Sequence, residues 1–94
     1  MSQIEWSPAA NKTKLAIVRG LMGANLQAAL RLTVVIETEI SRLAKFPELG
    51  RPGRLTGTRE LVIGRTKYIA VYKISGAGRI TILRLLHSAQ RWPK

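Results

Sequence analysis

The fold of this chain is decided by residues 61–86, which read LVIGRTKYIAVYKISGAGRITILRLL. Runs rich in β-branched and aromatic residues alternate there with short links that contain glycine. The runs and links are, in chain order, 61–63, Gly64-Arg65-Thr66, 68–74, Ser75-Gly76-Ala77-Gly78 and 80–86. Such runs favour pleated strands, and such links are typical of hairpins. We therefore predict an antiparallel three-stranded meander at about residues 57–87.

Two helices are predicted upstream of the meander. Ser7-Pro8 is typical of a helix start, because serine caps free backbone amides and proline suits the first helical position, so a helix is expected from about residue 8 to residue 21. Gly23-Ala24-Asn25 interrupts it, and Asn25 can cap a second helix. The apolar stripe of that helix comprises Leu26, Ala29, Leu32, Ile36, Ile40 and Leu43. Phe46-Pro47 ends it, because the residue before proline disfavours the α conformation.

These elements predict one domain, residues 1–94, of the α+β class. A chain of 94 residues is large enough for one core of helices against a sheet and too small for two. We expect the helix hairpin to pack antiparallel on one face of the meander. The remaining parts are, in order, a short strand at about 3–6, the helix hairpin at about 8–46, a turn-rich connector at 47–57, the meander, and a tail at 88–94.

The chain is strongly basic, with 16 Lys and Arg against 5 Asp and Glu and a net charge of +11. The excess is concentrated in residues 51–94, where ten basic residues accompany only Glu60, for a net charge of +9. Such a charge attracts nucleic acid, a nucleic-acid-bound machine or an acidic protein segment. A merely soluble basic surface is the alternative, and charge alone does not separate the two.

Several classes of chemistry are poorly supported by the composition. The chain has no cysteine and a single histidine, His87, which argues against disulfides, thiol nucleophiles, metal centres and cofactors. No apolar run approaches the roughly 20 residues of a membrane-spanning helix. The first residues lack the pattern of a secretory signal. We therefore expect a soluble, cytoplasmic protein without a membrane association.

Four segments together resemble the ParE/RelE toxin superfamily, and the chain is closer to its ParE-like branch. They are residues 46–53 (FPELGRPG), 57–62 (GTRELV), 68–72 (YIAVY) and 82–87 (ILRLLH). The resemblance covers essentially the whole chain and implies the toxin of a type II toxin–antitoxin pair. It also implies a cognate antitoxin whose C-terminal segment wraps the toxin and whose N-terminal part binds operator DNA, so the toxin meets operator DNA only through its partner.

The two branches of the superfamily differ in mechanism. RelE-like members cleave mRNA on the ribosome, which requires a base, an acid and cations that stabilise the phosphorane, whereas ParE-like members poison DNA gyrase. His87 is similar in position to a catalytic histidine of one RNase branch, but ParE-like members also resemble this stretch. The arginine and the glutamate of that branch correspond to Ile69 and Gly53 here. We therefore expect a non-catalytic toxin that binds gyrase.

The alternative is a ribosome-dependent mRNA endonuclease that uses His87 together with Arg65, Lys67 or Arg84. A third reading, a non-toxic nucleic-acid-binding module, leaves the family pattern unexplained. Glu48 or Glu60 could replace the missing base only if the fold brings one of them close to His87. Glu60 reads more simply as a paired surface charge beside Arg59. The residues expected to bind the target or the antitoxin are Arg59, Arg65, Lys67, Arg84, His87, Arg91 and Trp92.

Arg84 and Trp92 each leave two interpretations open. By strand alternation Arg84 would share a face with Ile80, Ile82 and Leu86, where a guanidinium without a partner is costly. In the first interpretation, Arg84 meets the target or an antitoxin carboxylate. In the second, it pairs within the chain with Glu5, Glu48 or Glu60, or its side chain extends to water. Trp92 would either stack on a base or fill an antitoxin pocket, or fold back over the edge of the core.

Overall fold

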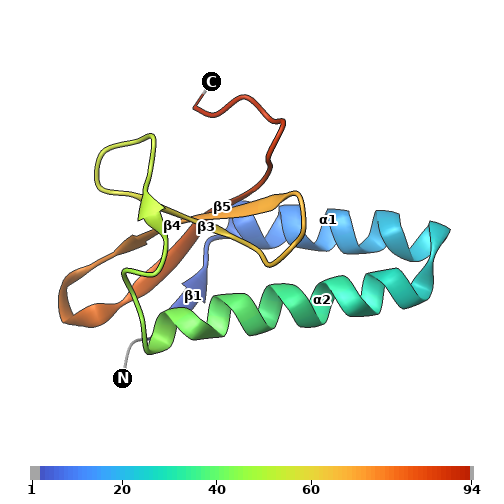
Figure 1. Ribbon diagram of the computed structural model, residues 1–94, viewed down its shortest axis with the longest axis horizontal. Helices are drawn as coiled ribbons and strands as arrows, with labels where there is room; N and C mark the ends of the chain where they lie inside the picture. Colours follow the sequence, from blue (N-terminus) through green and yellow to red (C-terminus); the bar gives the residue numbers. More distant parts are fainter. Residues whose placement is uncertain (1–2, 94) are drawn as a thin grey trace.

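The computed structural model describes residues 3–93 of the chain. Two long helices lie side by side beneath a five-stranded sheet, as Figure 1 shows. The elements are β1 (Ile4–Trp6), α1 (Pro8–Ala24), α2 (Leu26–Ser41), the 3₁₀ turn η1 (Arg42–Ala44), β2 (Arg51–Pro52), β3 (Arg59–Val62), β4 (Tyr68–Ile74), the 3₁₀ turn η2 (Gly76–Gly78) and β5 (Ile80–His87). The predicted α+β class, with a helix hairpin on a meander, is confirmed.

The sheet has the strand order β1-β5-β4-β3-β2. The three central strands, β3, β4 and β5, form the predicted antiparallel meander. At one edge β1 pairs with β5 in parallel, with Ile4 opposite Ile80. At the other edge β2 pairs with β3, so the segment expected to be only a connector also contains a strand. The meander is therefore extended by one short strand on each side.

The helices begin where the sequence places their caps. The Ser7 hydroxyl accepts a hydrogen bond from the Ala10 amide at 3.1 Å, and the Asn25 side chain accepts one from the Ala28 amide at 3.0 Å. α1 continues to Ala24, past its expected end near Leu21, because Asn25, in an extended conformation, is the residue that ends it. Among residues 3–93, neither helix is both long enough and apolar enough to cross a membrane.

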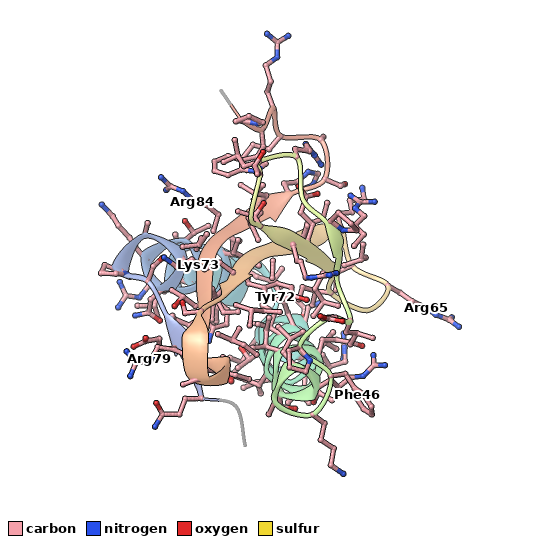
Figure 2. The ribbon with its side chains drawn as sticks, turned by 90° about the vertical axis from the view of Figure 1, so that its left-hand side faces the viewer. Phe46, Arg65, Tyr72, Lys73, Arg79 and Arg84 are labelled. Carbon is pink, nitrogen blue, oxygen red and sulfur yellow. The ribbon has the colours of Figure 1, made fainter. Side chains whose placement is uncertain are left out.

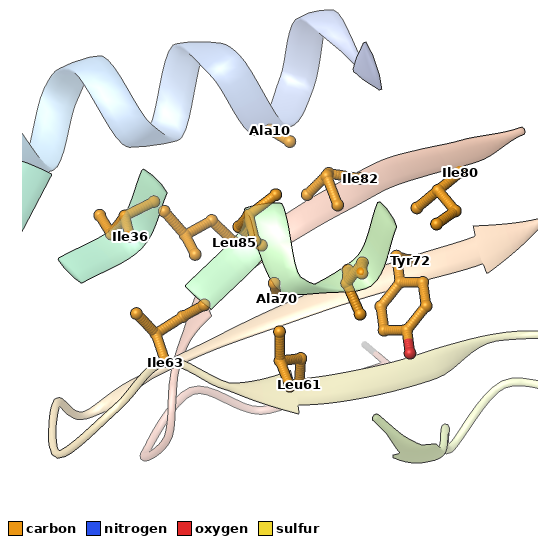
Figure 3. Packing of buried hydrophobic residues seen from close by; sticks show 11 residues of the cluster. Ala10, Ile36, Leu61, Ile63, Ala70, Tyr72, Ile80, Ile82 and Leu85 are labelled. Atoms are coloured by element: carbon orange, nitrogen blue, oxygen red, sulfur yellow. The ribbon is translucent and has the colours of Figure 1, made fainter. Parts of the chain in front are cut away.

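The core lies between the helices and the inner face of the sheet (Figure 3). Its buried members are Ala10, Ile36, Ile40, Leu43, Leu61, Ile63, Ala70, Tyr72, Ile80, Ile82 and Leu85. Most of the predicted α2 stripe is buried or packs against the core, but Leu26 is 54% exposed. Leu26 is the first residue of α2, at the end of the helix hairpin that extends beyond the sheet in Figure 1.

The pairing of β4 with β5 contains a bulge. Val71 lies opposite Arg84, whereas the next residue, Tyr72, lies opposite Ile82, so Leu83 has no partner of its own. An extra residue in one strand reverses the faces to which all later side chains of that strand point. The bulge therefore resets the alternation of β5 in the middle of the strand.

Because of this bulge, the environment of Arg84 differs from the predicted one. Ile80 and Ile82 point toward the helices, but after the bulge Leu85 takes that direction. Arg84 therefore lies with Leu86 on the opposite side of the sheet, which we call the outer face. The prediction that Arg84 shares a face with Ile80 and Ile82 is wrong, and the guanidinium does not enter the core.

A hydrogen-bonded tyrosine holds the connector against the sheet. The buried Tyr72 hydroxyl donates to the Pro47 carbonyl at 2.7 Å and accepts from the Gly50 amide at 2.9 Å. Burial raises the pKa of Tyr72 above its ordinary value, so the hydroxyl stays protonated and able to donate. Gly50 packs so closely that a Cβ atom there would lie 2.7 Å from Tyr72 Cε1. Only glycine allows this approach.

We predict opposite stability changes for two glycine-to-alanine substitutions. Gly50→Ala should lower the free energy of unfolding by about 1–3 kcal/mol, because the added methyl group overlaps Tyr72 and the Glu60 carbonyl. Gly20→Ala should raise it by about 0.5–1 kcal/mol, because this helical position is open and alanine favours the helix. Urea unfolding of both variants measures this. A Gly50→Ala variant as stable as the parent would contradict the packing described here.

Candidate functional site

A row of side chains crosses the outer face from β2 to β5. Arg51 of β2 lies opposite Glu60 of β3, Glu60 opposite Val71 of β4, and Val71 opposite Arg84 of β5. Side chains of residues paired in this way point to the same face of a sheet. The chain thereby brings a carboxylate and arginines from distant parts of the sequence onto one surface.

Glu60 is the buried centre of this row, with its side chain only 1% exposed. Arg51 Nη2 donates to its Oε1 at 3.2 Å, the Arg54 amide donates to its Oε2 at 3.0 Å, and Arg54 Nε lies 3.4 Å from Oε1. The prediction of a surface charge beside Arg59 is wrong. Arg59 belongs to the inner face and donates to the carbonyls of Gly50 and Glu48.

These contacts set the charge state of Glu60. Burial alone would raise its pKa, but the hydrogen bonds from the Arg54 amide and Arg51, together with the charges of both arginines, hold it below the ordinary value of 4.5. A carboxylate in this state is a weak proton acceptor near neutral pH. Glu60 is therefore suited to holding the connector in place and poorly suited to general-base catalysis.

The C-terminal tail covers part of the outer face, and Figure 1 shows it above the sheet, opposite the helices. Arg54 Nη1 donates to the Trp92 carbonyl at 3.0 Å, and the Arg84 guanidinium carbon lies 5.9 Å from the centre of the Trp92 ring. Trp92 is partly buried, and its Nε1 is buried without a hydrogen-bond partner in the described chain. The structure thus places Trp92 back against the domain, and Arg84 is exposed with no acidic partner among residues 3–93.

Beneath the tail, the outer face is apolar. Ile69, Val71 and Leu86 point away from the helices, yet all three are buried. Ile69, which the resemblance aligns with an arginine of the RNase branch, is a buried apolar side chain of this face. This part of the sheet is packed, rather than open as a catalytic cleft requires.

His87 lies at the end of β5 and on the side opposite Glu60. It is opposite Tyr68, with the rings T-shaped and 5.7 Å apart, and its Nδ1 accepts a hydrogen bond from the Ala89 amide at 3.1 Å. Alternation from Arg84 points His87 to the helix side of the sheet. An acid at His87 and a base at Glu60 therefore face different sides.

The other predicted cations are scattered. Arg65 and Lys67 are exposed beside the turn between β3 and β4, and Arg91 is exposed in the tail. Figure 2 shows Arg65 and Arg84 extending from opposite sides of the molecule. Within the described chain, no histidine and carboxylate side chains gather in the way a metal ion requires. The predicted site residues thus form several surfaces rather than one centre.

Two exposed apolar surfaces were missed by the sequence reasoning. One lies on α2, where Leu30 (55% exposed) and Val34 (63%) line a depression of about 350 Å³ together with Arg31. The other is a cleft of about 610 Å³ lined by Phe46, Pro47, Glu48, Leu49 and Ile74. A signal for the first was present, since Leu26, Leu30 and Val34 recur at steps of four beside the buried stripe.

Known proteins identify the family. The sequence matches the family described as ParE toxin of type II toxin–antitoxin system, parDE, over residues 4–92. The chain belongs to the ParE toxin family. As a ParE-family member it is a toxin of the type II toxin–antitoxin class, which confirms the resemblance drawn from its segments.

A relative agrees with this assignment, and two solved structures share the fold. The putative toxin Y4kP of Sinorhizobium fredii is 43% identical over 67 residues, which cover 71% of this chain and 68% of the relative. The chromosomal ParDE system of P. aeruginosa shares the fold with a TM-score of 0.81, at 24% identity, covering 93% of this ParE chain and 96% of that one. The toxin–antitoxin complex RelBE2 of Mycobacterium tuberculosis shares the fold with a TM-score of 0.60, at 21% identity. The match covers 90% of this chain and 95% of that chain.

We predict that Glu60 makes the stability of this ParE-family toxin depend on pH. Its pKa is lower in the folded chain than in the unfolded chain, so the ionised group stabilises the fold above about pH 4.5, and this contribution is lost as the pH falls through the folded-state value. Glu60→Gln should therefore lower the free energy of unfolding by about 1–3 kcal/mol at neutral pH. It should also flatten the dependence of stability on pH in the acid range.

Glu37→Gln is the matched control, because it removes the same charge from an exposed pair with Lys14. Such a pair contributes about 0–1 kcal/mol. Denaturant unfolding at a series of pH values measures both variants. Equal losses from the two substitutions would contradict a special role of the buried carboxylate.

Proposed function

We propose that this toxin inhibits growth by binding DNA gyrase without catalysis and that a cognate antitoxin neutralises it. Membership of the ParE family supports the choice of gyrase. The single observation that carries the non-catalytic reading is the separation of the groups that a nuclease would need to bring together. Glu60 is buried beneath arginines on the outer face, whereas His87 points to the other side of the sheet.

Parallel assays on one sample of purified toxin test this proposal. The toxin is added to a gyrase supercoiling reaction and, separately, to a translating ribosome mixture that contains end-labelled mRNA. Loss of supercoiling or accumulation of cleaved DNA, with intact mRNA, is expected. Codon-positioned cuts in the mRNA with gyrase unaffected would instead establish the ribosome-dependent endonuclease.

We predict that His87→Ala retains gyrase inhibition within a fewfold of the parent, because the imidazole has no catalytic task in this mechanism. A nuclease that lost its general acid would be slowed by about 10²–10⁴-fold. The supercoiling assay and a growth assay read the effect, and a thermal melt verifies that the variant is folded. A folded variant without toxicity would contradict the non-catalytic reading.

The exposed face of α2 supports the antitoxin part of the proposal. Ile36 and Ile40 on one side of α2 are buried, whereas Leu26, Leu30 and Val34 on the other side are exposed. The exposed apolar side of α2 is therefore expected to be covered by a partner, because monomers rarely leave contiguous apolar surface in water. An amphipathic helix in the shallow depression would supply that cover.

Charge favours an acidic partner over a second copy of the toxin. Arg31 lines the depression and has no ion pair within residues 3–93, and both glutamates of α2, Glu37 and Glu39, are already paired with other residues. Two copies of a chain with a net charge of +11 would repel one another. An acidic amphipathic segment of an antitoxin meets both the apolar and the charge requirement.

We predict that Leu30→Glu weakens antitoxin binding by about 10–100-fold, the equivalent of losing about 1.5–3 kcal/mol of apolar burial. Gyrase inhibition by the free toxin should persist if gyrase does not use this face. Thr38→Glu is the control, since it adds the same charge at an exposed position of α2. Co-expression with the neighbouring open reading frame, followed by titration calorimetry of the purified partners, measures the difference. Equal affinities for Leu30→Glu and Thr38→Glu would contradict the α2 surface.

A further inference from the structure

Some basic side chains on the surface of the toxin have no acidic partner, and the ion pairs of the described chain identify them. Nearly every carboxylate in the described chain is neutralised locally, since Glu5, Glu37, Glu39 and Glu60 each lie in an ion pair. Glu48, the remaining acidic residue, lies in the connector and lines the cleft beside Phe46. Two cations of the outer face, Lys73 and Arg84, are therefore left without an acidic partner among residues 3–93, whereas Arg51 and Arg54 are paired with Glu60.

The strand register places these two cations on one face at a defined spacing. Lys73 lies opposite Thr81, and Arg84 lies opposite Val71, two residues away along β4. At about 3.4 Å per residue along a strand and about 4.8 Å between strands, the Cα atoms of Lys73 and Arg84 are about 8 Å apart, close enough for both side chains to reach neighbouring phosphates of one strand. Both side chains are exposed, and Figure 2 shows them with Arg79 along the same side of the molecule.

Trp92 supports the guanidinium of Arg84 from the side of the tail. The guanidinium carbon lies 5.9 Å from the centre of the indole ring, within the range of a cation–π contact. The Trp92 carbonyl accepts a hydrogen bond from Arg54, which holds this part of the tail against the outer face, and the indole ring is partly buried. Arg84 is thus oriented while the guanidinium stays accessible to a ligand.

The surroundings of Lys73 and Arg84 distinguish between a protein and a nucleic acid as ligand. Their cross-strand neighbours expose no large apolar side chain, since Val71 is buried and Thr81 is partly buried. The centres of protein interfaces are poor in lysine, and the one aromatic ring beside Arg84, that of Trp92, is partly buried. Lysine and arginine together are typical contacts to phosphate. The apolar face of α2 has the opposite character, so the two surfaces suit different partners.

We propose that Lys73 and Arg84 form a non-catalytic site for successive phosphates of a single-stranded nucleic acid. The site holds the backbone by charge, independently of base sequence, and lies on the opposite side of the sheet from the helices. It does not depend on gyrase being the target. The resulting affinity for nucleic acid comes from these two residues of the outer face and not only from the net charge of the toxin.

Fluorescence anisotropy with a fluorescein-labelled oligothymidylate tests the site on the full-length toxin. Lys73→Gln combined with Arg84→Gln should weaken binding about tenfold at low salt. The slope of log K against log salt concentration should flatten by about 1.4, because each phosphate contact with a single strand contributes about 0.7. Both positions are exposed, and thermal unfolding midpoints are compared first to verify that the variant is folded.

Lys12→Gln combined with Arg19→Gln is the matched control, because it removes one lysine and one arginine from exposed positions of α1. The control pair should leave the salt slope unchanged and reduce the affinity less than twofold. Equal losses from both pairs would show that net charge alone attracts the probe and would overturn the site. Absence of binding by the parent toxin at low salt would overturn it as well.

Discussion

The unpaired residue in β5, Leu83, determines the surface that every later side chain of that strand joins. Without the bulge, Leu85 would leave the core and Arg84 would enter it, at the cost of a buried charge. With the bulge, the apolar side chain completes the packing against the helices and the guanidinium reaches water. The same shift points His87 to the helix side, so one irregularity fixes the core, the cationic outer face and the orientation of the histidine.

Glu60 shows how the outer face is stabilised where no helix covers it. A buried carboxylate is expensive unless donors surround it, and here Arg51 and the Arg54 amide supply them from the connector. On the inner face Tyr72 holds the same connector through Pro47 and Gly50. The connector is therefore fixed to both faces of the meander, and Gly50 is required there by packing rather than by backbone conformation.

Local chemistry made much of the fold predictable from sequence. The caps at Ser7 and Asn25 and the alternating runs of the meander depend on neighbouring residues, so the helix starts and the central strands could be inferred. The predicted end of the second helix is too late, because α2 ends at Ser41 and a 3₁₀ turn, Arg42–Ala44, precedes the expected stop at Phe46-Pro47. The bulge at Leu83 and the partners of Glu60 depend on residues distant in sequence. Simple alternation therefore placed Arg84 on the wrong face, and sequence order paired Glu60 with Arg59 instead of Arg51 and Arg54.

The position of the two proposed binding surfaces constrains how neutralisation can work. The apolar face of α2 is exposed on the helix layer, and Lys73 and Arg84 lie on the face of the sheet opposite the helices. An antitoxin segment confined to α2 would leave Lys73 and Arg84 accessible. Neutralisation then requires either that the target also uses α2, or that the antitoxin chain continues around the domain to the outer face. An acidic segment is suited to the second route, because the unpaired cations it would meet there are the same ones that would hold phosphate.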